Sequence, residues 1–115
     1  MENELINVVE NQKGDITVLK IKGKLDSLLA PSLEKKIFTY LNEGHTKLIL
    51  DFSDITYINS AGLRMLLSIK KQIRSFQGAL IVCSLRSEVL EMLKICGFDH
   101  VLEIAANEEE ALRRL

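Results

Sequence analysis

The stretch YINSAGL, residues 57–63, has the pattern of a strand that ends at a short turn and runs directly into a helix. The apolar run KLILDF at residues 47–52 precedes it, as expected of a strand buried on both faces of a sheet covered by helices. From about Ala61 to Phe76, apolar side chains recur at helical spacing and form one stripe. A buried strand followed at once by an amphipathic helix is typical of α/β domains.

The segments on either side of this stretch continue the alternation of strands and helices. β-Branched residues in 5–11 and 15–23, separated by QKG, predict a hairpin, and the spacing of Leu29, Leu33, Ile37 and Leu41 predicts a helix that stops at Gly44. The elements expected after the central stretch are a buried strand at 79–85, a helix at 87–98 opened by Ser87 and closed by Gly97, a short strand at 101–104, and a terminal helix at 107–115 capped by Asn107.

This order predicts a single α/β domain over residues 1–115. We expect one mixed sheet that begins with an antiparallel hairpin and continues as parallel βαβα units, with about four helices. In such sheets the functional groups gather beyond the carboxyl ends of the strands. Both GKLDS, residues 23–27, and YINSAGL are expected at that edge.

Composition and charge narrow the classes of function. Fifteen basic and sixteen acidic residues give a net charge of −1, and the basic residues are scattered, which argues against a nucleic-acid partner. No apolar run approaches the ~18 residues of a membrane span, and the first residues do not resemble a secretion signal. We therefore expect a cytoplasmic protein with no membrane partner.

The residues that could carry metal or cofactor chemistry are isolated. Cys83 and Cys96 form no C-x-x-C pair and are expected to be reduced thiols in the core, whereas His45 and His100 are expected in exposed loops. The chain contains no glycine-rich phosphate loop. We therefore expect neither a metal nor a cofactor.

Ser60, at the junction of strand and helix, has three possible roles. It can cap the helix through its hydroxyl, and we expect it to do so in part. It can be a nucleophile, although a nucleophile elbow requires G-x-S-x-G and here Ile58 stands two residues before the serine. A nucleophile also needs a base, and both histidines are expected at the opposite edge of the sheet. The third role is that of a modified residue, because a helix N-terminus accommodates a phosphate.

DFSDITYINSAGL (residues 51–63), preceded by GKLD (residues 23–26), resembles the signature of the STAS domain family, and within it the stand-alone bacterial anti-sigma factor antagonists. The resemblance extends over essentially the whole chain. It implies a partner-switching protein and not an enzyme: the unmodified form binds an anti-sigma factor that is also a serine kinase and so frees a sigma factor. The kinase then phosphorylates the signature serine, and a PP2C-type phosphatase resets the protein.

Carried over by position, the resemblance places the phosphorylated serine at Ser60. Many members have Asp before this serine and a second Ser or Thr after it, whereas this chain has Asn59 and Ala61. The protein is expected to be a monomer when free. The residues expected to contact the partner are Asp26, Ser27, Asn59, Ser60, Ala61, Gly62, Leu63, Arg64 and Leu67.

Several of these residues also have a purely structural interpretation. Asp26 can initiate the turn into the first helix, Asn59 can form an Asx-turn, and Gly62 can allow close packing. Leu63 and Leu67 can belong to a wide buried arc of the helix.

Two alternative functions stay open from the sequence. The chain can be a STAS subunit of a larger assembly, such as a lipid transporter or a stress-signalling complex, in which Ser60 is only a cap. More remotely, it can be a small hydrolase that uses Ser60 as its nucleophile.

Overall fold

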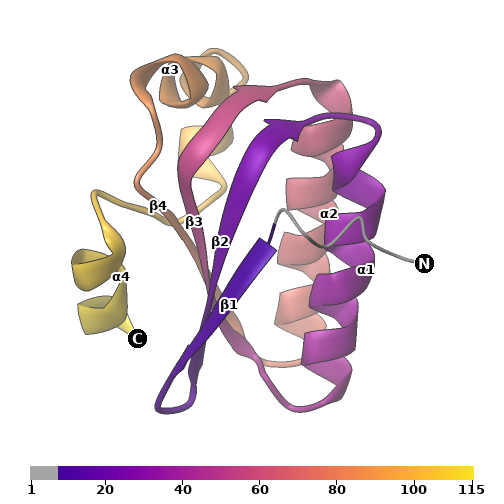
Figure 1. Cartoon of the computed structure of the whole chain (residues 1–115), viewed down its shortest axis with the longest axis vertical. Coiled ribbons are helices and arrows are strands. Elements are labelled where there is room, and N and C mark those ends of the chain that lie inside the picture. Colours follow the sequence, from indigo (N-terminus) through magenta and orange to yellow (C-terminus); the bar gives the residue numbers. More distant parts are fainter. Residues whose placement is uncertain (1–7) are drawn as a thin grey trace.

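The computed structural model describes residues 8–115, which form a five-stranded mixed sheet with helices on both faces (Figure 1). The part of the first expected strand before Val8 lies outside the described residues. The single-domain α/β architecture predicted from the sequence is confirmed. In chain order the elements are β1 (Val8–Lys13), β2 (Ile16–Leu25), α1 (Leu29–Asn42), β3 (Lys47–Ile58), α2 (Ser60–Ser75), β4 (Ala79–Cys83), α3 (Ser87–Ile95), β5 (Ile104–Ala105) and α4 (Glu108–Arg114).

The sheet begins with the expected antiparallel hairpin, but its turn is shorter than QKG. Gln12 and Lys13 still belong to β1, where they pair with Thr17 and Ile16, so the turn contains only Gly14 and Asp15. Gly14 has a φ of 64°, a left-handed conformation that glycine adopts without the strain of a side chain. The Thr17 hydroxyl donates to Gln12 Oε1 at 2.9 Å, which extends the pairing of the strands toward the turn.

The remaining strands pair in parallel, and the spatial order β1-β2-β3-β4-β5 follows the chain. β3 is the central strand, as expected from KLILDF, but it continues to Ile58 and is longer than predicted. Its second half stays paired with β2 up to Leu25 opposite Ile58, through two irregularities in the register. The buried Asp51 accepts a hydrogen bond from the Ser53 amide at 2.9 Å beside the first of them.

Two layers of unequal size cover the sheet. α1 and α2 lie side by side along one face and α4 lies on the other, while α3 sits at the end where β2 and β3 finish (Figure 1). Buried side chains of α1, α2 and α3 join one large apolar cluster with the sheet. A smaller cluster, which includes Cys83 and Ala111, fills the space under α4. The buried KLILDF strand therefore contributes to both cores, as its apolar sequence predicts.

The two thiols differ in their surroundings. Cys83 is buried, as predicted, and this burial raises the pKa of its thiol to about 11. Cys96 is exposed, so the expectation of a second core thiol is wrong. It is the residue that follows the last turn of α3, and Gly97 after it has a left-handed φ of 77°.

Of the two residues predicted to begin α3 and α4, only one is a helix cap. Ser87 does not cap α3, because it is already the first helical residue and Arg86 occupies the cap position without a side-chain bond. Asn107 does cap α4, accepting from the Glu110 amide at 2.8 Å. The short strand also begins later than expected, at Ile104, because residues Phe98–His100 form a 3₁₀ turn.

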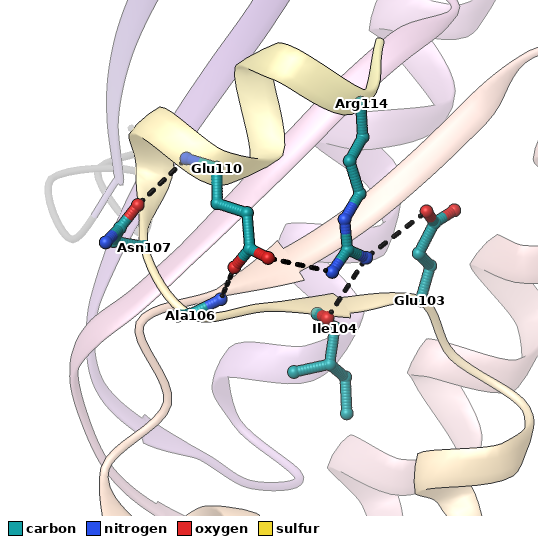
Figure 2. A network of polar contacts seen from close by, with 6 residues as sticks. All are labelled: Glu103, Ile104, Ala106, Asn107, Glu110 and Arg114. Atoms are coloured by element: carbon teal, nitrogen blue, oxygen red, sulfur yellow. Dashed lines mark hydrogen bonds and ion pairs between the residues drawn. The ribbon is translucent and has the colours of Figure 1, made fainter.

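α4 is fixed to the sheet edge by a polar network that begins at its cap (Figure 2). The Glu110 side chain accepts from the Ala106 amide at 2.6 Å and pairs with Arg114 at 3.1 Å. Arg114 also donates to Ile104 O at 3.2 Å and lies 3.4 Å from the Glu103 carboxylate. These contacts hold a helix that has only seven residues, too few for helix propensity alone to stabilise it.

Candidate functional site

The two sequence segments expected to carry function meet at the carboxyl end of the sheet. Leu25 ends β2 and Ile58 ends β3, and these residues are paired in register. One residue later, the Asn59 amide donates to Leu25 O at 3.3 Å. Gly62 packs so closely on the same carbonyl that an added Cβ would lie only 2.4 Å from it. The absence of a side chain at Gly62 thus lets α2 begin directly against the end of β2.

Asn59, not Ser60, is the cap of α2. Its backbone is extended, with φ −122° and ψ −170°, and its Oδ1 accepts from the amides of Ala61 at 3.0 Å and Gly62 at 3.3 Å. Ser60 is already the first helical residue, so the expectation that it caps the helix is wrong. The residue at the cap position has a non-helical backbone, whereas the backbone of Ser60 is already helical. Its side chain is exposed.

Asp26 forms the turn into α1, which is one of the two roles expected for it from the sequence. Its Oδ1 accepts from the amides of Leu29 and Leu28, each at 3.1 Å, and so shapes the link into α1. These two amide donors hold the pKa of the Asp26 carboxyl below its ordinary value. The residues that follow it, Ser27 and Leu28, are exposed, Leu28 to 85% of its surface.

A hollow of about 410 Å³ lies between the first turns of α1 and α2. It brings together three of the predicted partner-binding residues, Ser27, Ala61 and Arg64. Its remaining lining residues are Ala30, Pro31, Glu34, Met65 and Ser68. The hollow therefore links the segment after Asp26 to the first three turns of α2.

The other predicted partner-binding residues are less accessible. Gly62 is buried, and Leu63 is half-buried and packs against the large core. Leu67 is also half-buried. The partial burial of both leucines agrees with a wide buried arc on α2. Among the residues of α2 that were predicted to bind the partner, Ser60 and Arg64 are exposed.

Sequence reasoning missed a polar cluster on the wall of the hollow. Glu34 Oε2 accepts from the Ser68 hydroxyl and from Gln72 Nε2, the latter at 2.9 Å, so it joins α1 to α2. Gln72 Oε1 is buried and has no partner among residues 8–115. No pattern within either helix marks these residues, because the cluster depends on how the two helices pack.

Sequence reasoning also missed an exposed aromatic residue three positions before Ser60. Tyr57 is 47% exposed and lines a second hollow, of about 150 Å³, together with Glu88, Val89 and Met92 of α3. The exposure of Tyr57 could not be predicted from the sequence, because a single exposed aromatic residue in a strand or turn is common in proteins.

His45 is far from Ser60. His45 precedes β3, and the twelve residues of that strand, at about 3.3 Å each, separate it from Ser60. His100 lies in the 3₁₀ turn that precedes β5. His100 is exposed as expected, whereas His45 is half-buried, with its ring edge-on to Tyr40 at 5.9 Å. His45 is therefore too far from Ser60 to act as its base in this arrangement.

The described residues, 8–115, contain neither a candidate metal site nor a candidate membrane span. Within residues 8–115, no three His, Cys, Asp or Glu side chains are grouped as a metal ion would require. None of the helices there combines the length and the apolar character needed to cross a bilayer.

Comparison with known proteins identifies the family. The STAS domain model matches residues 7–111, nearly the full length of the chain. The chain belongs to the STAS domain family. It is 35% identical over 91 residues to BtrV of Bordetella bronchiseptica, named as a candidate anti-sigma factor antagonist, with 79% of this chain and 78% of BtrV covered.

Two other relatives of this STAS protein extend the comparison. The anti-sigma-B factor antagonist of Bacillus subtilis is 29% identical over 105 residues, which cover 90% of this chain and 94% of that protein. The crystal structure of a candidate anti-sigma factor antagonist from Thermotoga maritima superposes with a TM-score of 0.88 and 26% identity, covering 93% of this chain and 92% of the other. The family resemblance inferred from residues 23–26 and 51–63 is confirmed.

Proposed function

We propose that this protein is an anti-sigma factor antagonist whose binding is switched by phosphorylation of Ser60. One observation carries the proposal: Ser60 is exposed at the head of α2, beside the hollow lined by Ser27, Ala61 and Arg64, in a STAS chain whose relatives are named anti-sigma factor antagonists. In the unmodified form, this surface binds a cytoplasmic anti-sigma factor that is also a serine kinase. Binding releases the sigma factor that the anti-sigma factor had held.

The modification is a phosphoryl transfer in which the partner supplies the ATP. Ser60 Oγ forms a bond to the γ-phosphorus, the bond from that phosphorus to the β-phosphate oxygen breaks, and ADP leaves. The hydroxyl proton passes to a base of the kinase. In the reverse branch, a PP2C-type phosphatase directs water onto the phosphorus, and inorganic phosphate leaves while Ser60 regains its proton.

The position of Ser60 supports a switch that works at the surface. A phosphoserine carries about −1.5 to −2 charges at neutral pH. Because Ser60 is exposed and Asn59 supplies the cap, the helix does not depend on the Ser60 hydroxyl. The phosphate therefore changes the charge and bulk of the binding surface while the fold is retained, and the partner dissociates.

Incubation with the cognate kinase and ATP, followed by intact mass and peptide mapping, tests the proposal. The parent should gain one phosphate, and Ser60→Ala should gain none while still binding the anti-sigma factor in calorimetry. Ser53→Ala is the matched control, because it removes a hydroxyl from the same strand-to-helix segment and should still be phosphorylated. Labelling that persists in Ser60→Ala and maps to Ser53 or Thr56 would refute the assignment.

Calorimetry on a charge-mimicking variant tests the consequence of modification. Ser60→Asp should bind the anti-sigma factor more weakly than Ser60→Ala, and both should give the circular dichroism spectrum of the parent. A parent that binds the anti-sigma factor but is never phosphorylated would instead support a STAS subunit without a switch.

A further inference from the structure

Arg64 lies one helical turn after Ser60 on the same side of α2. Both residues are exposed. Side chains four residues apart on a helix are neighbours, with about 5–6 Å between their Cβ atoms. Helical side chains also lean toward the N-terminus, so the Arg64 side chain extends in the direction of Ser60.

The backbone at the head of α2 offers few donors to a group on Ser60. The amides of Ala61 and Gly62 already donate to Asn59 Oδ1, and the Leu63 amide donates to Asn59 O at 3.0 Å. A phosphate on Ser60 therefore gains little from these three amides, and a nearby cationic side chain is the stronger partner that the helix can offer it. This arrangement separates the site from helix N-termini whose amides are open to an anion.

Arg64 is the basic residue of α2 that can be this partner. The next ones along the helix, Lys70, Lys71 and Arg74, begin six residues beyond Arg64, or about 9 Å along the axis. Among residues 8–115, Arg64 forms no ion pair. No carboxylate of residues 8–115 therefore competes with a new acceptor for its guanidinium.

The carboxylates near the hollow have other partners. Asp26 accepts from two backbone amides, and Glu34, which lines the hollow with Arg64, accepts from Ser68 and Gln72. These bonds hold both carboxylates in place. A phosphate dianion on Ser60 is a stronger acceptor than a carboxylate and pairs with arginine through two donors at once.

We propose that Arg64 binds the phosphate of phosphorylated Ser60 and turns away from the hollow in doing so. This inference rests on the proposed phosphorylation of Ser60. One modification then changes the binding surface at two points: it adds negative charge at Ser60 and withdraws a positive charge from beside Ser27. Arg64 is thus a positioning residue for the modified state, which it stabilises as a dianion.

The test uses the full chain with phosphoserine incorporated at position 60 during translation, so that no kinase is needed. Phosphorus NMR titration gives the second pKa of the phosphate in three proteins: the parent, Arg64→Gln and the matched control Arg74→Gln. The control removes the same charge from an exposed position of the same helix. Arg64→Gln should raise this pKa by about 0.15 to 0.4 unit relative to the parent, and Arg74→Gln should leave it unchanged.

A second variant separates a specific pair from a general charge effect. Arg64→Lys keeps the charge but loses the two-donor geometry, so its phosphate pKa should lie between those of the parent and Arg64→Gln. Equal pKa values for the parent and Arg64→Gln, or equal rises for Arg64→Gln and Arg74→Gln, would overturn the inference.

The outcomes also separate this inference from the proposed function. A kinase that fails to label Ser60 would refute the proposed switch, whereas the titration would still report on Arg64. Conversely, normal labelling with a phosphate pKa indifferent to Arg64 would refute only the role of Arg64. Circular dichroism and urea unfolding of Arg64→Gln verify that the exposed substitution leaves the domain folded.

Discussion

Gly62→Ala should destabilise the protein, although alanine is the better helix former. The added Cβ would lie 2.4 Å from Leu25 O and 2.9 Å from Ile58 Cγ1, whereas ordinary contact begins near 3.4 Å. The difference, 3.4 − 2.4, means that α2 and the end of β2 must separate by about 1 Å. The atom in the way is a backbone oxygen that also accepts from the Asn59 amide, so it cannot rotate aside.

The two opposing effects of Gly62→Ala can be compared in magnitude. Overpacking costs about 1–3 kcal/mol, and a clash with backbone belongs at the upper end of that range. The higher helix propensity of alanine stabilises the folded state by about 1 kcal/mol. We therefore expect the free energy of unfolding to fall by about 2 kcal/mol, which lowers the urea midpoint by about 1 M at an ordinary m-value.

Urea unfolding followed by circular dichroism measures this change in Gly62→Ala. Lys71→Ala, an exposed substitution on the same helix, is the control and should stay within about 0.5 kcal/mol of the parent. A Gly62→Ala protein as stable as the parent, or more stable, would show that α2 does not press on the end of β2 and would refute the packing argument.

Three further predictions concern the cap, the thiols and the response to acid. Asn59→Ala should lower the free energy of unfolding by about 1 kcal/mol, whereas Asn59→Asp, which keeps the acceptor, should change it little in the same urea assay; equal losses would refute the cap. In the native protein, a thiol-reactive dye should modify Cys96 at once and Cys83 only after unfolding, and Cys96→Ser should abolish the fast phase. Because the pKa of Asp26 is lowered in the fold, its contribution is present above pH ~4 and lost as the pH falls through the folded pKa. Asp26→Asn should therefore lose less stability than the parent between about pH 5 and pH 2, and identical pH profiles would contradict this.

The sheet and helices could be predicted from the sequence because their apolar spacing is regular. KLILDF has no polar interruption, and the stripe through Leu66, Ile69 and Ile73 repeats at helical intervals. The full length of β3 could not be predicted in this way. Residues 53–58 contain polar positions typical of a turn, and they form a strand only because β2 continues alongside them through register irregularities.

The site was predictable in its location but not in its details. Parallel strands place their carboxyl ends at one edge, which is why residues 23–27 and 57–63 could be expected together. Asn59 and Ser60 are both good capping residues, so only the backbone conformation decides that Asn59 is the cap. The Glu34 cluster could not be foreseen, because residues from separate helices form it.

The order of the strands in the sheet has a consequence for biosynthesis. Each strand pairs only with the strands that come directly before and after it in the chain. Every strand therefore finds its partner in a segment that is synthesised shortly before or after it. β1, β2, α1 and β3 can associate while the rest of the chain is still being translated. Short separations in sequence also lower the entropic cost of each pairing and favour rapid folding. Newly made copies of the protein can therefore complete their sheet strand by strand, with little time for an open edge to meet another nascent chain.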